Sequence, residues 1–314
     1  MIWLIRQLLK TRFGRSIARF LNRFSLPGFD GLSVLEVLRF FFLGLQKGAI
    51  KTRAASMAYH FFLAIFPSIL FLFTLIPYVP IENFQVRLLE LLREVMPESA
   101  FLAAQDTLME IIHRGNSKLL SFGFLAALFF STNGFDSMFT AFNKSIHVED
   151  TRLPWKQRLI ALLAGLVTAV IIVITLSLLI GSEYMVHRYM DPGALSSTLL
   201  WIGKTFFLGL LILTSIAFFY HVGPAKRMHW RFISPGAILA TVLMLLTSEA
   251  FGFYVNNFGS YNKLYGSIGT IIIVLIWLSL NSTMLLIGFE LNAGIDAARK
   301  NRRSLQMPEV EEEA

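Results

Sequence analysis

Two long apolar runs near the end of the chain constrain its fold more than any other feature. Residues 264–289 contain no Asp, Glu, Lys or Arg, and a helix of that length, about 39 Å, exceeds the roughly 30 Å hydrocarbon core of a bilayer. The preceding run, residues 232–254, is as apolar except for Glu249. An ionised carboxylate inside a membrane helix costs about 2.5 kcal/mol or more unless it faces protein or water. The two runs predict a transmembrane hairpin. Contact with lipid alone does not account for the carboxylate of Glu249 within this hairpin.

The composition supports the membrane class. Of 314 residues, 55% are hydrophobic and only 15% are charged, whereas soluble domains carry about 25% charged residues. The chain has no Cys, which excludes disulfides, thiolate metal sites and cysteine nucleophiles.

The hydropathy pattern predicts an all-α membrane protein with six transmembrane helices in one domain. The expected spans are about 54–79, 119–142, 159–182, 199–222, 232–256 and 265–290. Residues 1–53 predict two amphipathic helices that lie on the membrane surface and bind anionic lipid headgroups. The second of these helices is predicted to begin with a capping box formed by Ser33 and Glu36. Residues 82–118 predict an outer helical insert, and residues 293–314 a disordered acidic tail.

The distribution of basic residues predicts the orientation. With both ends in the cytoplasm, the cytoplasmic segments hold 21 of the 28 Lys and Arg residues, as the positive-inside rule requires. This topology accounts for the net charge of +8 without a nucleic-acid partner. The expected partners are lipid headgroups, a small solute and a second copy of the chain in a homo-oligomer.

Several segments resemble the YihY/virulence factor BrkB family of bacterial inner-membrane proteins. They are SPGA at 234–237, YVNNFGSYNKLYGSIG at 254–269, LLIGFELNA at 285–293 and ASMAYHFFLAIFPSILF at 55–71, with Asn143, Arg152 and Arg158 after the second span. The resemblance covers about residues 50–295, and His60 stands where a second Tyr is common. It implies six transmembrane helices in the bacterial inner membrane and transport as the usual suggested activity, beside an older ribonuclease label.

Two pairs of polar residues lie at matching depths within the expected spans. Lys204 and Glu249 both lie near the outer ends of their spans. Three alternatives remain: the two residues form a structural ion pair, they form a site that couples transport to a gradient or binds the substrate, or they do not touch. Asp136 and His60 lie near the inner boundary beside Tyr59, and they predict either a proton relay or local hydrogen bonding of Asp136. Asn133, Asp136, Thr140 and Asn143 recur at helical spacing, which predicts one polar face.

Polar residues also mark both ends of the last hairpin. The link between its helices predicts a tight outer turn or, alternatively, an outward gate or a rim that binds headgroups. The candidate residues of the link are Tyr254, Asn257, Tyr261, Asn262 and Tyr265. Glu290 closes the last span, where a carboxylate opposes the helix dipole, and therefore predicts a basic partner among Arg53, Arg152 and Arg158.

The residue inventory argues against catalysis. The six His residues form no metal-binding pattern, and neither a GxSxG motif nor a phosphate-binding loop occurs. We therefore expect no catalytic residue, no metal and no cofactor. The leading hypothesis is a gradient-driven transporter or exporter of a small polar or amphiphilic solute. The alternative is a non-transporting envelope protein that binds lipid headgroups or scaffolds partners.

Overall fold

A computed structural model describes residues 22, 24–29, 31–75, 117–148, 152–189, 194–225, 232–258 and 267–306. The predicted first surface helix before residue 22, most of the predicted insert 82–118 and the hairpin link 259–266 lie outside these residues, and their predictions are untested.

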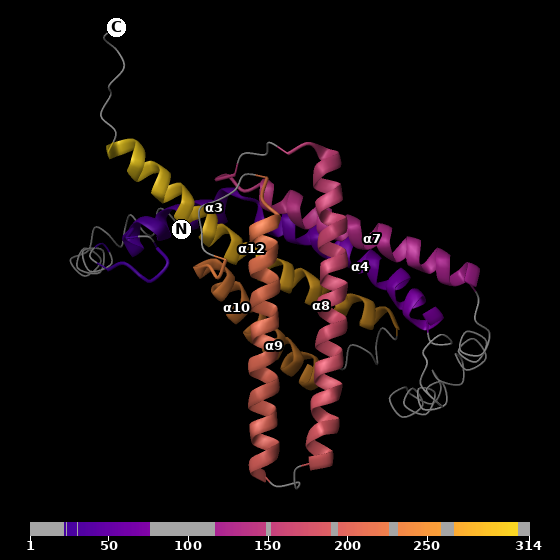
Figure 1. Cartoon of the computed structure of the whole chain (residues 1–314). Coiled ribbons are helices and arrows are strands. Elements are labelled where there is room, and N and C mark those ends of the chain that lie inside the picture. Colours follow the sequence, from indigo (N-terminus) through magenta and orange to yellow (C-terminus); the bar gives the residue numbers. More distant parts are fainter. Residues whose placement is uncertain are drawn as a thin grey trace.

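The described residues form helices and no strand. The helices are α3 (Val34–Lys47), α4 (Ile50–Leu75), α7 (Ser117–Asn143), α8 (Pro154–Tyr189), α9 (Ala194–Val222), α10 (Pro235–Phe258) and α12 (Ser267–Gln306), as labelled in Figure 1. Within the described residues, each of the six predicted spans falls mainly on one of the long helices α4, α7, α8, α9, α10 and α12. The all-α prediction is confirmed for this part of the chain.

Three of these helices are long and apolar enough to cross a membrane by length and composition. The qualifying segments within the described residues are Pro154–Ile172, Pro235–Val255 and Ile271–Ser304, and α9 adds a shorter apolar segment, Phe206–Val222. The described parts of the six predicted spans are thus mainly helical, whereas the number of times that the chain crosses the membrane stays a prediction.

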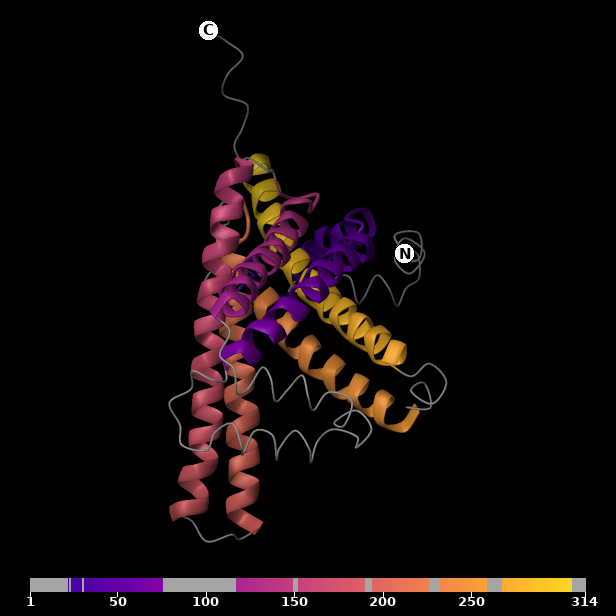
Figure 2. The same ribbon diagram turned by 90° about the vertical axis from the view of Figure 1, so that its right-hand side faces the viewer.

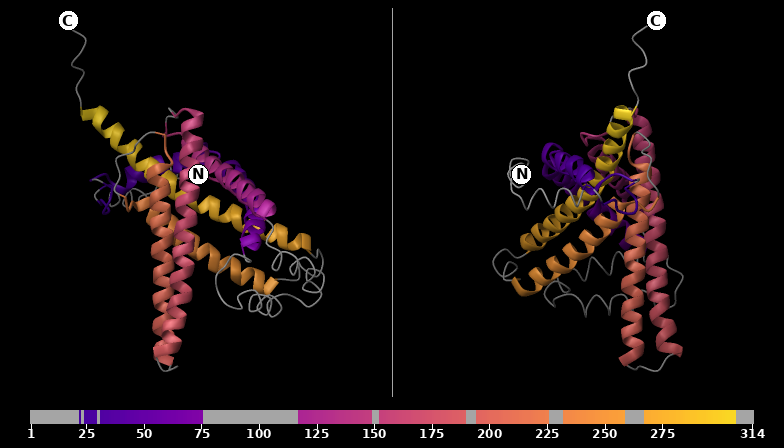
Figure 3. Two further views of the ribbon diagram at one scale, coloured as in Figure 1. Left: turned by 45° about the vertical axis from the view of Figure 1, so that its right-hand side comes forward. Right: turned by 90° about the vertical axis from the view of Figure 1, so that its left-hand side faces the viewer.

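The long helices meet at one end, which we call the packed end, around the fully buried rings of Phe139, Phe142, Tyr220 and Phe289. There α4 packs against α7, and α12 packs against α3, α4 and α10. Away from the packed end the helices diverge: α8 and α9 run together in one direction, while α10 and α12 run in another (Figures 2 and 3). We call this diverging part, with exposed Val170, Phe206, Phe253 and Ile276, the open half.

Helix α3 begins as the sequence predicts. The Ser33 side chain accepts a hydrogen bond of 3.2 Å from the backbone N–H of Glu36, which satisfies one of the free donors at a helix start. The helix then packs its Val37 against Ile295 and Ala298 of α12. This packing joins α3 to α12, while its predicted location on the membrane surface stays a prediction.

Residues 293–306, for which the sequence predicts disorder, are helical. Helix α12 continues from the last span without a break to Gln306. Its extension is helical because Ala293, Ile295 and Ala298 are buried and give the segment an apolar face for α3 and its neighbours. Residues 307–314 of the predicted acidic tail lie outside the described part of the chain.

Candidate functional site

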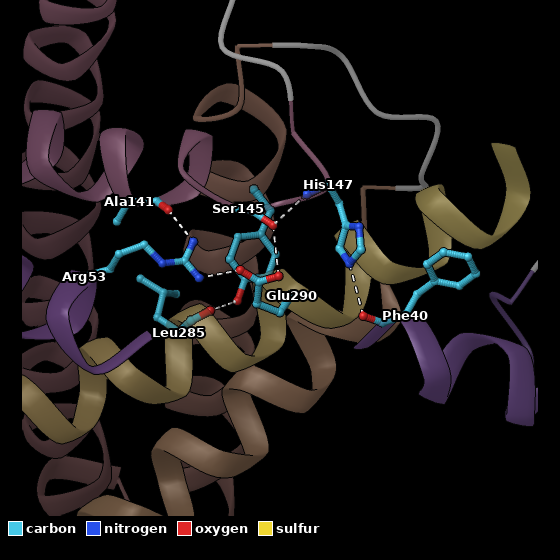
Figure 4. Close-up of polar contacts among 8 residues, drawn as sticks. Phe40, Arg53, Ala141, Ser145, His147, Leu285 and Glu290 are labelled. Carbon is cyan, nitrogen blue, oxygen red and sulfur yellow. Dashed lines mark hydrogen bonds and ion pairs between the residues drawn. The ribbon is translucent and has the colours of Figure 1, made fainter. Parts of the chain in front are cut away.

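The packed end contains a buried ion pair between the first turn of α4 and the middle of α12. Arg53 Nη2 donates to Glu290 Oε1, and both side chains are buried. The other carboxylate oxygen, Oε2, accepts a 2.9 Å hydrogen bond from Ser145 Oγ. Arg53 Nη1 donates to the Ala141 carbonyl of α7 at 2.7 Å (Figure 4). The prediction that Glu290 needs a basic partner is confirmed, and the partner is Arg53.

Helix α3 can approach this ion pair because it presents glycine there. A Cβ atom at Gly44 would lie 2.5 Å from Glu290 Oε2, and one at Gly48 would lie 2.9 Å from Arg53 Nη2. His147 adds a further link, since its Nε2 lies 3.1 Å from the Phe40 carbonyl (Figure 4). The ion pair thus ties α4, α7, α12 and the loop after α7 together, and His147 links this loop to α3. All of these contacts lie in a region of low dielectric.

A second polar cluster joins α7 to α8. Gln157 Nε2 donates to Asp136 Oδ1 and to Thr140 Oγ1, both at 2.9 Å. Gln157 Oε1 accepts from Asn143 Nδ2 at 3.0 Å, and Asn143 Oδ1 accepts from the Ala225 N–H at 2.8 Å. The predicted polar face of α7 is confirmed. Gln157 is absent from the predicted site residues, although an amide in the first turn of an apolar helix is a signal that could have identified it.

The structure does not bring Asp136 and His60 together. Helix α4 packs on a different side of α7, where Ser56 Oγ lies 3.3 Å from Ser137 Oγ and the Phe61 ring lies against Phe135. His60 instead packs edge-on against Tyr59, with ring centroids 5.3 Å apart. Ser137 and Asp136 are neighbours in sequence and therefore point about 100° apart around the helix. No contact among the described residues supports the proton relay.

The remaining candidates lie in the open half. Glu249 and Tyr254 are exposed on α10. Lys204 lies on α9 and Asn257 on α10, but their side chains are outside the described part of the structure, so the pairing of Lys204 with Glu249 stays a prediction. Tyr261, Asn262 and Tyr265 lie outside the described residues.

Two of the segments on which the family resemblance rests meet in space, where α10 crosses α12. Asn292 Oδ1 accepts from the Gly236 N–H at 2.8 Å, and its Nδ2 donates to Ser234 Oγ at 2.7 Å. A Cβ atom at Gly236 or Gly288 would collide with the backbone carbonyl of the other glycine. Close backbone approach and a buried amide therefore position the α12 helix that carries Glu290.

Neither cluster has the composition of a metal centre. In the ranges that the structure describes, no group of three or more His, Asp or Glu side chains is arranged to hold a metal ion. What the packed end can do chemically is to pair a carboxylate with a guanidinium and to bind helices together through amides and hydroxyls.

Relatives of the chain carry two kinds of name. A Bacillus subtilis (strain 168) protein, YfkH, named as ribonuclease-like, is 30% identical over 253 residues, which cover 80% of this chain and 91% of that protein. Among proteins named UPF0761 membrane protein, one from Alteromonas mediterranea is 33% identical over 43% of this chain and 48% of its own length. One from Xanthomonas campestris pv. campestris (strain B100) is 33% identical over 30% of this chain.

This chain spans only 22% of the length of that Xanthomonas relative. No solved structure matches the chain. The family described as Virulence factor BrkB matches residues 41–313, a range that includes both polar clusters and the α10–α12 crossing. The chain is therefore a membrane protein of the virulence factor BrkB family.

Proposed function

We propose that this protein crosses the bacterial inner membrane six times, with both ends in the cytoplasm, and moves a small polar or amphiphilic solute under the drive of an ion gradient. The observation that carries the proposal is Glu249, a carboxylate exposed in the open half of a molecule that is tightly packed at its other end.

The packed end has the properties of a closed gate. The Phe142 and Phe289 rings stack with centroids 4.4 Å apart, and Tyr220 packs edge-on against both. These side chains are fully buried. Such an aromatic plug, together with the neighbouring Arg53–Glu290 pair, excludes water from the centre of the helices at this end.

The open half has the properties of an access region. Glu249 lies on α10 within an apolar segment long enough to cross a membrane, near the exposed side chains of Leu246 and Phe253. A carboxylate in that setting is stabilised when a proton, a metal cation or a cationic group of a solute binds to it. The apolar side chains around it suit the hydrocarbon part of an amphiphile.

The name of the Bacillus subtilis relative raises ribonuclease activity as another class of function. Metal-dependent RNA cleavage needs clustered carboxylates, and in the described parts of the chain no such cluster holds a metal-binding arrangement. We propose that the protein is not an enzyme.

The alternative is a non-transporting envelope protein that binds lipid headgroups or scaffolds partners. The dry, aromatic packing around Phe142 favours this alternative, because a scaffold requires no water-filled pathway. The two proposals differ in what they require of Glu249: the transporter needs its charge, whereas the scaffold does not.

Flux measurements test the proposal directly. The purified full-length protein is reconstituted into liposomes, and uptake of a panel of small polar and amphiphilic solutes is measured with and without a proton or sodium gradient. We expect gradient-dependent uptake of at least one solute, and a loss of at least about tenfold in Glu249→Gln. Glu36→Gln is the matched control, since Glu36 lies in the first turn of α3 outside the expected spans. Uptake that is equal in Glu249→Gln and the wild type excludes the proposed role of this carboxylate.

A further inference from the structure

We propose that α7 and α8 form a binding site for one anionic phospholipid, with its phosphate at Arg158 and Asn133 and an acyl chain along an apolar stripe of α7. The site lies on the outside of the helices and does not depend on whether the protein transports a solute.

The headgroup position is defined by the bonding of Arg158. Its side chain is exposed on α8, and its Nη2 donates to Asn133 Oδ1 at 3.3 Å. The guanidinium carbon also lies 5.5 Å from the centre of the Phe129 ring. Among the described residues, no carboxylate forms an ion pair with Arg158, and the nearby Asp136 accepts from Gln157 instead. Several of the five N–H donors of Arg158 therefore remain available, in the planar arrangement that matches a phosphate group.

The depth of Arg158 favours a lipid phosphate. Helix α8 begins at Pro154, and its segment that is long and apolar enough to cross a membrane begins there as well. Trp155 is 63% exposed, and Lys156 lies 5.5 Å from the centre of its ring, a combination typical of the membrane–water interface. Arg158 lies three residues further along, about 4.5 Å deeper. At that depth lipid phosphates are the abundant anions within reach of an arginine side chain.

An apolar stripe on α7 leads away from this headgroup position. Phe122, Leu125 and Phe129 are 65%, 62% and 52% exposed, and their spacing of three and four residues places them on one helix face. Asn133 follows Phe129 by four residues and continues the same face up to Arg158. The stripe therefore offers a continuous surface for an acyl chain whose phosphate is held by the guanidinium, and the positive charge of Arg158 and Lys156 selects an anionic lipid.

Lipid binding to the purified full-length protein tests the proposal. Native mass spectrometry measures the binding of phosphatidylglycerol and phosphatidylcholine with identical acyl chains. We expect phosphatidylglycerol to bind about tenfold more tightly at one site, and Arg158→Gln to remove most of this preference. The matched control is Arg303→Gln, because Arg303 is exposed on α12 outside both residues 1–53 and the proposed site, and its substitution changes the net charge equally; it should change the preference by less than about twofold.

The acyl-chain part of the site is tested separately. Phe129→Ala should lower the affinity for both lipids by about threefold, since it removes apolar contact area and leaves the charges unchanged. An unchanged preference for phosphatidylglycerol in Arg158→Gln overturns the headgroup assignment. If millimolar inorganic phosphate displaces phosphatidylglycerol completely and Phe129→Ala has no effect, the site binds a free anion, and the assignment of a lipid as its ligand is overturned. Because Arg158 and Phe129 are exposed, both variants should keep the thermal stability of the wild type.

Discussion

The packed end and the open half place the same chemical groups in opposite environments. Glu290 and Glu249 both lie on apolar helices of the last hairpin. Glu290 is fully buried and receives hydrogen bonds from Arg53 and Ser145, whereas Glu249 is exposed. A carboxylate in an apolar run is thus either buried in an ion pair or left exposed, and the difference is set by its neighbours in space.

The apolar residues show the same contrast. Phe142 is completely buried at the packed end, while Phe253 is 68% exposed in the open half. A Cβ atom at Gly288 would meet the backbone of α10, while one at Gly252 would meet nothing within 4 Å. The free energy of folding should therefore depend mainly on the packed end, which leaves the open half able to change its helix contacts at low cost.

The largest expected difference separates the two carboxylates. Glu290→Gln should lower the free energy of unfolding by about 3–5 kcal/mol, because it leaves the Arg53 charge buried without its counter-ion. Glu249→Gln, the same change in the open half, should alter it by less than about 0.5 kcal/mol. Denaturant titration in detergent micelles measures both values, and equal effects would show that the contrast between the two ends is absent in the membrane-like environment.

The aromatic residues provide a second comparison. Phe142→Ala should cost about 3–5 kcal/mol, since it leaves a cavity between Phe139, Tyr220 and Phe289. Phe253→Ala should cost less than about 1 kcal/mol because the ring is exposed. The same denaturant titration applies, and a large loss in Phe253→Ala would indicate that another helix or chain covers this part of α10.

The glycines should respond with opposite signs. Gly288→Ala should destabilise the protein by about 1–3 kcal/mol, because the added methyl group forces α10 and α12 apart. Gly252→Ala should stabilise it by about 0.5–1 kcal/mol through its higher helix propensity. The midpoints of thermal unfolding should therefore move in opposite directions. A stabilising Gly288→Ala would argue against the close backbone crossing.

The smallest effect is expected for an ion pair near the packed end in which only the lysine is exposed. Lys300 Nζ lies 2.7 Å from Asp296 Oδ2 one turn away on α12, and the lysine side chain is largely exposed. Lys300→Ala should change the free energy of unfolding by less than about 1 kcal/mol. A loss comparable to that of Glu290→Gln would mean that the C-terminal extension of α12 contributes more to stability than its exposure indicates.

The positions and type of the long helices could be predicted from the sequence because hydropathy and length are local properties. The same is true of the Ser33 cap, the polar face of α7 and the need of Glu290 for a basic partner. The proposed contact of Asp136 with His60 was inferred from similar depth alone. Depth does not define the direction in which a side chain points around its helix, and in the structure Asp136 faces Gln157.

The sequence by itself determined that the chain is a membrane protein made of long apolar helices with few charges among them, since apolar runs of this length are unstable in water. Only the tertiary structure decided that Arg53 is the partner of Glu290, that Gln157 covers the polar face of α7, and that α12 extends past residue 293 to pack on α3. These contacts depend on how closely the helices approach and at what angle they cross. Such geometry is set by pairs of residues distant in sequence, among them Gly236 and Gly288, and neither segment alone specifies its partner.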